Sequence, residues 1–231
     1  ILTVDVPNVG KQTPKEVNTE VKPVIAIPKA NTRVLYIGGT VTFSHEYEGP
    51  KGSKVLKRTW DFGDEETNST DSEEAILHTY KKSGKLEATL TVDVPNVGIQ
   101  IEPLPIDVRP VIAEIEAQPV KLKVNKEVTF TNNTDGPKDK MAWHWDFGDG
   151  NESTEKSPSH IYKKHGEFKV ILTVRVLDDE GKIIQDIAPI PSEPLVVTVE
   201  PVYVQPFITK IEAGAPRMKG DAWFLPVSVE V

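Results

Sequence analysis

Apolar and polar residues alternate along two segments of this chain. The apolar positions of the first segment are Leu86, Ala88, Leu90, Val92 and Val94, and those of the second are Phe168, Val170, Leu172, Val174 and Val176. A period of two residues is typical of a β-strand that buries one face. The pattern therefore predicts two long strands, each with one side toward a core.

Turn-forming residues divide the rest of the chain into short pieces. The 231 residues include 19 prolines and 15 glycines, and no amphipathic pattern longer than two helical turns is found. Several short strands in a unit of this length are typical of a β-sandwich. We therefore expect an all-β fold of antiparallel sandwiches.

The chain contains an internal repeat. The sequence Trp-Asp-Phe-Gly-Asp occurs at 60–64 and again at 145–149, and the flanking segments match in the same order. The other matching pairs are 21–26 with 108–113, 41–43 with 128–130, 78–80 with 160–162, and 90–92 with 172–174. Because a repeated unit of this size is usually one folded module, we predict domains at 23–108 and 109–205.

The two ends resemble parts of further units. Residues 2–10 are identical to residues 90–98, and residues 206–213 echo residues 110–117. Residues 1–22 are thus expected to be the final strands of a preceding repeat, and residues 206–231 the opening strands of a following one. Either the native protein is longer than 25.6 kDa, or these end strands pair with neighbouring copies and build a filament.

Composition narrows the function classes. There are no cysteines, which excludes disulfides and thiolate chemistry, and the net charge is -8, which disfavours a nucleic-acid partner. No apolar run is long enough to span a membrane, and Ile1 does not open a signal peptide. An extracellular or cell-surface location is the expectation, with any export signal outside this segment.

The ordered motifs resemble the PKD domain, an immunoglobulin-like sandwich of surface and secreted proteins. Trp-Asp-Phe-Gly-Asp-Gly at 145–150 is followed by His-x-Tyr and by an alternating strand. The resemblance covers both full repeats and implies tandem sandwiches. Their Val-x-Pro-Val joints would be stiff, because proline restricts itself and its neighbour, so a rod-like array is expected. Glu65 stands where the second repeat has Gly150, which predicts a differently built turn after Asp64.

Most motif residues are interpreted as determinants of the fold. Trp60 and Phe62, like Trp145 and Phe147, are two apart and should face the core. The aspartates on either side of the motif glycine can accept backbone N–H bonds and close a turn. Tyr80 and Tyr162 suit a tyrosine corner. His78 and His160 occupy equivalent positions, which favours packing or hydrogen bonding over zinc binding.

No catalytic or cofactor-binding residues are predicted. Asp-Phe-Gly also occurs in protein kinases, but the other kinase motifs are missing, as are His-Glu-x-x-His and Gly-x-Ser-x-Gly. Calcium binding by the acidic loops is less favoured than solvated charged loops, because the acidic residues lack the regular spacing of a calcium loop. Those residues are Asp64, Glu65, Glu66, Asp71, Glu73, Glu74, Asp178, Asp179 and Glu180.

The sequence favours a non-catalytic structural or adhesive segment of a cell-surface protein, acting as a stalk or as part of a filament or surface layer. Its partners would be further copies of itself, neighbouring surface proteins, or extracellular polysaccharide or protein. The alternative is an accessory module that brings a secreted hydrolase to polysaccharide or protein. That alternative predicts exposed aromatic residues, with Trp143 and Trp223 as candidates.

Overall fold

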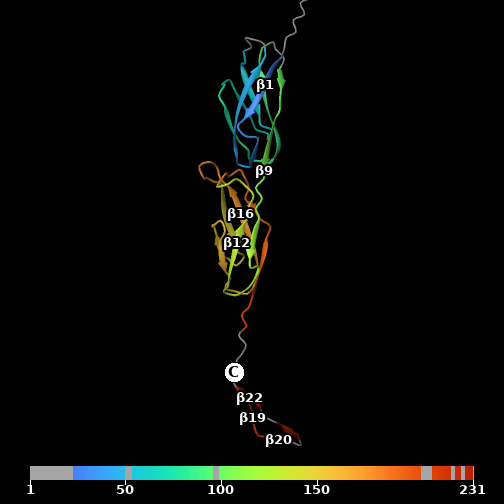
Figure 1. Ribbon diagram of the computed structural model, residues 1–231, viewed down its shortest axis with the longest axis vertical. Helices are drawn as coiled ribbons and strands as arrows, with labels where there is room; N and C mark the ends of the chain where they lie inside the picture. The colour runs from blue at the N-terminus through green and yellow to red at the C-terminus, as the bar shows by residue number, and fades with distance from the viewer. Residues whose placement is uncertain are drawn as a thin grey trace, which may run out of the picture. The chain divides into compact units, whose positions relative to one another are not determined.

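The computed structural model describes residues 23–49, 54–95, 99–203, 210–219, 222–224 and 227–230. Every regular element in these residues is a β-strand, and no helix occurs among them. The all-β prediction is therefore confirmed. Figure 1 shows the strands of the first repeat from blue to green and those of the second from green to orange.

The first repeat is a sandwich of two sheets. Its strands are β1 (Val24–Ala30), β2 (Val34–Tyr36), β3 (Thr40–Glu48), β4 (Lys57–Asp61), β5 (Thr67–Thr70), β6 (Ile76–Thr79), β7 (Gly84–Asp93), β8 (Ile99–Ile101) and β9 (Leu104–Arg109). One sheet has the order β6-β3-β1-β8 and the other β2-β9-β7-β4-β5. A single core cluster contains residues of both sheets, including Phe43 on β3 and Trp60 on β4.

The second repeat has the same arrangement. Its strands are β10 (Ile115–Gln118), β11 (Lys121–Lys123), β12 (Glu127–Asn132), β13 (Met141–Asp146), β14 (Glu152–Ser153), β15 (Ser159–Ile161), β16 (Gly166–Val176), β17 (Ile190–Pro191) and β18 (Leu195–Glu200). The sheets are β10-β12-β15 and β11-β18-β16-β13-β14, with β17 paired to β16. Phe130 of one sheet lies 5.6 Å from Trp145 of the other, measured between ring centroids.

The alternating segments form the longest strands of each repeat. On β7, Ala88, Leu90 and Val92 are buried, while Thr91 and Asp93 between and beyond them are exposed. On β16, Val170, Leu172, Val174 and Val176 are buried in the same way. The period of two residues thus identified the buried face correctly, since side chains alternate across a pleated strand.

Some edge pairs are parallel, which the sequence pattern did not predict. β1 pairs in parallel with β8, β2 with β9, and β11 with β18. In the first repeat the opening segment changes sheets between β1 and β2 and so reaches the last strand of the other sheet. Local alternation gives no information on strand direction, because either direction buries the same face.

The chain ends are described only in part. Residues 1–22 lie outside the described residues, so the prediction of a preceding repeat stays a prediction. Within 206–231, β19 (Lys210–Ala213) pairs with β22 (Val227–Glu230), and β20 (Arg217–Lys219) with β21 (Ala222–Phe224). The stiff, rod-like arrangement of repeats likewise stays a prediction.

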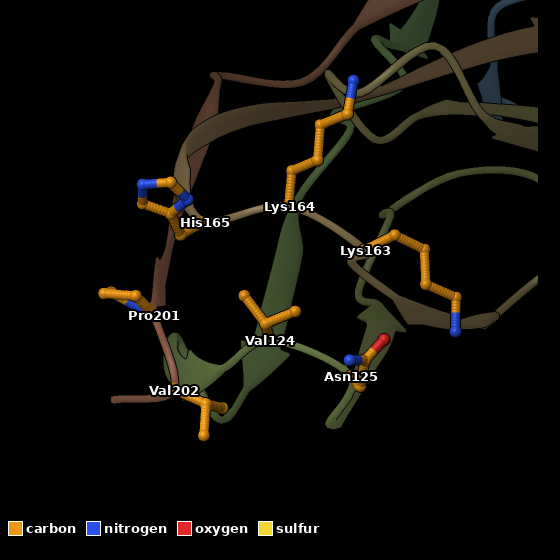
Figure 2. Close-up of a pocket in the computed structure, with 7 residues that line it drawn as sticks. All are labelled: Val124, Asn125, Lys163, Lys164, His165, Pro201 and Val202. Carbon is orange, nitrogen blue, oxygen red and sulfur yellow. The ribbon is translucent and has the colours of Figure 1, made fainter. Parts of the chain in front are cut away.

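One end of the second repeat carries an open depression, shown in Figure 2. It lies where β11, the loop before β16 and the end of β18 meet. Its lining residues are Val124, Asn125, Lys163, Lys164, His165, Pro201 and Val202.

Candidate functional site

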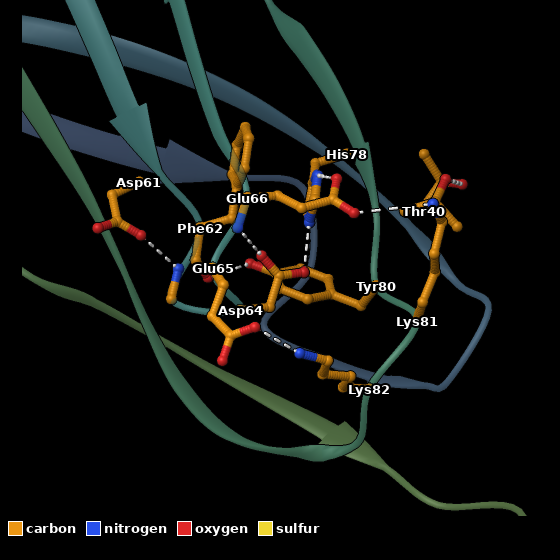
Figure 3. Close-up of polar contacts among 12 residues, drawn as sticks. Thr40, Asp61, Phe62, Asp64, Glu65, Glu66, His78, Tyr80, Lys81 and Lys82 are labelled. Atoms are coloured by element: carbon orange, nitrogen blue, oxygen red, sulfur yellow. Dashed lines mark hydrogen bonds and ion pairs between the residues drawn. The ribbon is translucent and has the colours of Figure 1, made fainter. Parts of the chain in front are cut away.

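The repeated Trp-Asp-Phe-Gly-Asp segment ends β4 and β13 and forms a tight turn in each repeat. Asp61 Oδ1 accepts the N–H of Gly63 at 2.9 Å, and Asp64 Oδ1 accepts the N–H of Glu66 at 3.1 Å. Figure 3 shows both bonds. The second repeat has the same pair of bonds, at 2.8 Å from Gly148 to Asp146 and 3.0 Å from Asn151 to Asp149. The predicted role of these carboxylates as turn-closing acceptors is confirmed.

The turn after Asp64 is the same in both repeats, so the prediction that Glu65 changes it was wrong. Glu65 adopts a left-handed φ of 77°, close to the 89° of Gly150. The bond from Phe62 N to Glu66 O, 3.2 Å, matches that from Phe147 N to Asn151 O, 3.1 Å. The surrounding hydrogen bonds hold the turn, and a side chain at this position projects into open space, as the absence of atoms around Gly150 shows. Glutamate therefore bears a backbone penalty but no clash.

The motif glycines differ from this position because they are sterically required. Gly63 and Gly148 have φ values of 80° and 78°. A Cβ at Gly63 would lie 2.7 Å from the carbonyl oxygen of Glu87, and one at Gly148 would lie 2.6 Å from that of Lys169. Each glycine thus allows the turn to pack directly on the backbone of the neighbouring long strand.

A histidine, an aspartate and two aromatic rings pack behind each turn. His78 Nε2 lies 2.8 Å from Asp64 Oδ2, and its ring stacks on Phe62 with centroids 3.9 Å apart. Tyr80 meets the histidine edge-on and donates its hydroxyl to the carbonyl of Phe62 at 3.1 Å. Figure 3 shows these side chains together.

The second repeat reproduces this cluster. His160 Nε2 lies 2.8 Å from Asp149 Oδ2, and its ring stacks on Phe147 with centroids 4.3 Å apart. Tyr162 donates to the carbonyl of Phe147 at 3.0 Å. The packing and hydrogen-bonding role predicted for both histidines is confirmed. The tyrosine hydroxyls bond to backbone carbonyls 18 and 15 residues upstream. A tyrosine corner bonds only a few residues upstream, so the predicted tyrosine corner is not what these residues form.

Burial and the neighbouring aspartates keep the tyrosine of each cluster protonated. Burial raises the pKa of Tyr80, and the negative charges of Asp64 and Asp61 raise it further. The pKa of Tyr162 is raised by burial and by Asp149 and Asp146 in the same way. Both phenols therefore remain neutral donors and cannot act as bases near neutral pH.

Asp149 is held as a carboxylate. Burial alone would raise its pKa, but hydrogen bonds from His160 and from Asn151 outweigh burial, and the pKa lies below its ordinary 3.8. Its two oxygens are already bonded to the histidine and to the turn. The carboxylate is thus engaged in holding the turn together.

The far end of the first repeat contains a buried arginine that the sequence analysis missed. Arg58 on β4 is only 2% exposed. It donates to the Tyr47 hydroxyl at 2.7 Å, to the Asp71 carbonyl at 2.8 Å and to Glu73 Oε1 at 2.8 Å. Its position two residues before the core Trp60 was the available signal, because alternation directs both side chains inward.

His45 on β3 completes the arginine cluster. Its Nε2 accepts a bond of 3.2 Å from Arg58 Nε. Burial lowers the pKa of His45, the charge of Arg58 lowers it further, and Glu73 opposes the change. His45 is therefore held neutral beside the buried arginine.

Several of the acidic residues considered for calcium are engaged in other contacts. Glu65 pairs with Lys82 at 2.7 Å and Glu73 with Arg58 at 2.8 Å, while Asp178 caps the turn that contains Glu180. Within the described parts of the chain, no three histidine, aspartate or glutamate side chains gather as a metal site. Calcium binding by these loops stays a weak prediction.

Of the two aromatic candidates for ligand binding, only Trp143 has a described side chain. Trp143 lies on β13 and is half-buried. Trp223 lies on β21, and its side chain is outside the described part.

Over the described residues, no helix has the length and apolar character needed to cross a bilayer.

These features define an immunoglobulin-like sandwich module in which motif residues stabilise the fold. The family model of the PKD domain matches residues 20–97 and 107–187. The chain belongs to the PKD domain family, which confirms the resemblance of the motifs.

Relatives of known activity match short segments of the chain. Collagenase ColQ1 of Bacillus cereus strain Q1 is 47% identical over 53 residues, which are 21% of this chain and 5% of the collagenase. The microbial collagenase of Vibrio alginolyticus is 43% identical over 63 residues, 26% of this chain and 8% of that protein. The matched segments thus span less than a tenth of these relatives.

Solved structures with low sequence identity are also similar. Three N-terminal domains of the outer capsid protein Hoc of bacteriophage RB49 match with a TM-score of 0.41 and 10% identity, covering 90% of this chain and 70% of theirs.

Proposed function

We propose that this chain is a non-catalytic spacer segment of an extracellular protein, in which tandem PKD domains act as a stalk. One observation carries the proposal: in both repeats the aspartate and histidine of the repeated motifs are used to stabilise the same turn. Asp64 and His78, like Asp149 and His160, bond to each other at 2.8 Å beneath that turn. These four side chains are therefore engaged in holding the turn of each module together.

An extracellular location is supported by the relatives. Matching segments occur in proteins named as collagenases, and collagen is an extracellular substrate. Two tandem PKD domains without disulfides suit a spacer that separates other domains.

A pulling experiment tests the spacer. When residues 1–231 are stretched between handles, each repeat should unfold in a separate event of similar force, because each has its own core and its own turn cluster. A single event for the whole chain, or extension without resistance, would contradict a stalk built from independent modules. Tyr80→Phe and Tyr162→Phe should each lower the force of one event only.

The second candidate is an accessory module that binds the substrate of a neighbouring hydrolase. The matches to collagenases of two genera favour it. Cosedimentation of the purified chain with insoluble collagen, and separately with insoluble polysaccharide, distinguishes the two candidates. The spacer predicts that the chain stays in the supernatant, whereas saturable binding that Trp143→Ala weakens, in a variant with an unchanged circular dichroism spectrum, would favour the accessory module.

A further inference from the structure

The two repeats differ in charge at the equivalent end. Each has a pair of lysines after its buried tyrosine, as Tyr-Lys-Lys-Ser-Gly at 80–84 and Tyr-Lys-Lys-His-Gly at 162–166. In the first repeat the turn beside these lysines carries two glutamates. Lys82 Nζ lies 2.7 Å from Glu65, whereas Lys81 Nζ lies 3.7 Å from Glu66 and 3.0 Å from Asp186.

The second repeat lacks these glutamates. Its equivalent turn residues are Gly150 and Asn151, and the equivalent lysines are Lys163 and Lys164. Both lysines are exposed and have no ion pair with any carboxylate in the described part of the chain. The equivalent lysines of the first repeat are thus paired with carboxylates, whereas Lys163 and Lys164 are not paired within the described residues.

The nearby acidic groups already have partners. Asp149 bonds to His160 at 2.8 Å and to the N–H of Asn151 at 3.0 Å. Glu200 pairs with Lys121 at 2.8 Å, and this hydrogen bond lowers the pKa of Glu200. Glu167 on β16 is exposed but does not line the depression. A local positive surface thus exists on a chain whose net charge is -8.

The lysines border an apolar floor. Val124 and Val202 line the same depression as Lys163, Lys164 and His165 (Figure 2). Val202 is 57% exposed and the adjoining Tyr203 is 83% exposed. An exposed apolar centre with a polar rim is a common arrangement in protein–protein interfaces.

We propose that this end of the second repeat, formed by Lys163, Lys164 and His165 around Val124 and Val202, is a docking surface for an acidic loop of another protein. The first repeat shows the matching chemistry, since the equivalent lysines pair with carboxylates of protein loops, namely Glu65 and Glu66 of the motif turn and Asp186. The occupant is therefore a loop with at least two neighbouring carboxylates and an aliphatic contact. This inference does not depend on the spacer role.

Polyglutamate is the probe for this surface. It is titrated into the isotope-labelled chain of residues 1–231 at low ionic strength, and backbone NMR shifts are followed. We expect saturable shifts confined to 163–165 and 124–125, and their loss near 1 M salt, where charges are screened beyond about 3 Å. Shifts spread over both repeats, or no saturation, would overturn the proposal.

Paired variants locate the charge. Lys163→Glu with Lys164→Glu should weaken polyglutamate binding by roughly tenfold or more, since two exposed ion pairs are lost and repulsion is added. Gly150→Glu with Asn151→Glu transfers the acidic residues of the first repeat and should weaken binding similarly while leaving both lysines in place. Lys156→Glu, in the loop between β14 and β15, is the control with the same type of charge change and should bind as the unmodified chain does.

Other occupants give distinct results. Equal or tighter binding of polygalacturonate at the same charge concentration would overturn the protein loop in favour of an acidic polysaccharide. Concentration-dependent self-association that the lysine variant abolishes would instead indicate a second copy. Unchanged polyglutamate affinity in the lysine variant would remove the surface from consideration, provided its melting temperature is unaltered.

Discussion

Single residues decide how strongly each turn of the fold is stabilised. The left-handed position after the second motif aspartate is Glu65 in one repeat and Gly150 in the other, with nearly equal φ values. An L-residue at such an angle is destabilising, whereas glycine tolerates it. The two repeats thus provide a natural comparison of the same turn with and without backbone strain.

Glu65→Gly should stabilise the first repeat by about 0.5–1 kcal/mol through relief of this strain. The measurement is urea unfolding followed by NMR signals assigned to each repeat. Gly150→Glu is the matched reverse change and should destabilise the second repeat by a similar amount. Changes of the same sign in the two variants would show that the φ angle is not the cause.

Arg58 is at the position in the first repeat that is equivalent to Trp143 in the second. Both precede the core tryptophan by two residues. In the first repeat the cluster of Arg58, His45, Tyr47 and Glu73 replaces apolar packing with hydrogen bonds. Removing one hydrogen-bonding partner of a buried charge lowers the stability of the fold, because the charge remains buried without compensation.

At the scale of elements, each turn is fixed to the long strand beside it. A Cβ at Gly63 would clash with the backbone of Glu87 on β7, and one at Gly148 would clash with that of Lys169 on β16. The glycine therefore allows the turn after β4 to lie against β7 in the first repeat, and the turn after β13 to lie against β16 in the second.

Gly148→Ala should destabilise the second repeat by roughly 3 kcal/mol, since the new Cβ adds a clash with a strand backbone to the strain of a positive φ. Gly150→Ala is the control, because it shares the positive φ but has no atom near its Cβ. It should cost only about 1 kcal/mol. Thermal unfolding monitored by tryptophan fluorescence gives both values, and equal costs would argue against the contact with Lys169.

At the scale of the whole chain, the repeats differ in their response to acid. The pKa of His45 lies below its ordinary 6.5 because of burial and Arg58. A folded-state pKa that is lowered means that the unfolded chain binds the proton first, so stability falls as pH drops below 6.5 and continues to fall toward the lowered value. The second repeat has Asn132 at this position.

The first repeat should therefore lose stability from pH 6.5 downward, whereas the Asp149 contribution to the second is lost only below about 3.8, since its folded-state pKa is also lowered. Unfolding midpoints of each repeat measured by NMR between pH 7 and 3 test this. His45→Asn, which copies the second repeat, should flatten the profile of the first between pH 6.5 and 5 in this experiment. A profile unchanged by that substitution would assign the effect to other groups.

The sequence by itself determined the all-β class, the duplication, the buried faces of β7 and β16, the core aromatics and the turn-closing aspartates. Each follows from a period of two residues or from chemistry within a few positions, which the order of residues records directly. The tertiary structure alone decided that Glu65 keeps the glycine turn, that Arg58 meets His45 and Glu73, and that edge strands pair in parallel. It also decided that Lys163 and Lys164 form no ion pair with the residues that the structure describes. These depend on strand register and on neighbours distant in sequence, which local patterns cannot encode.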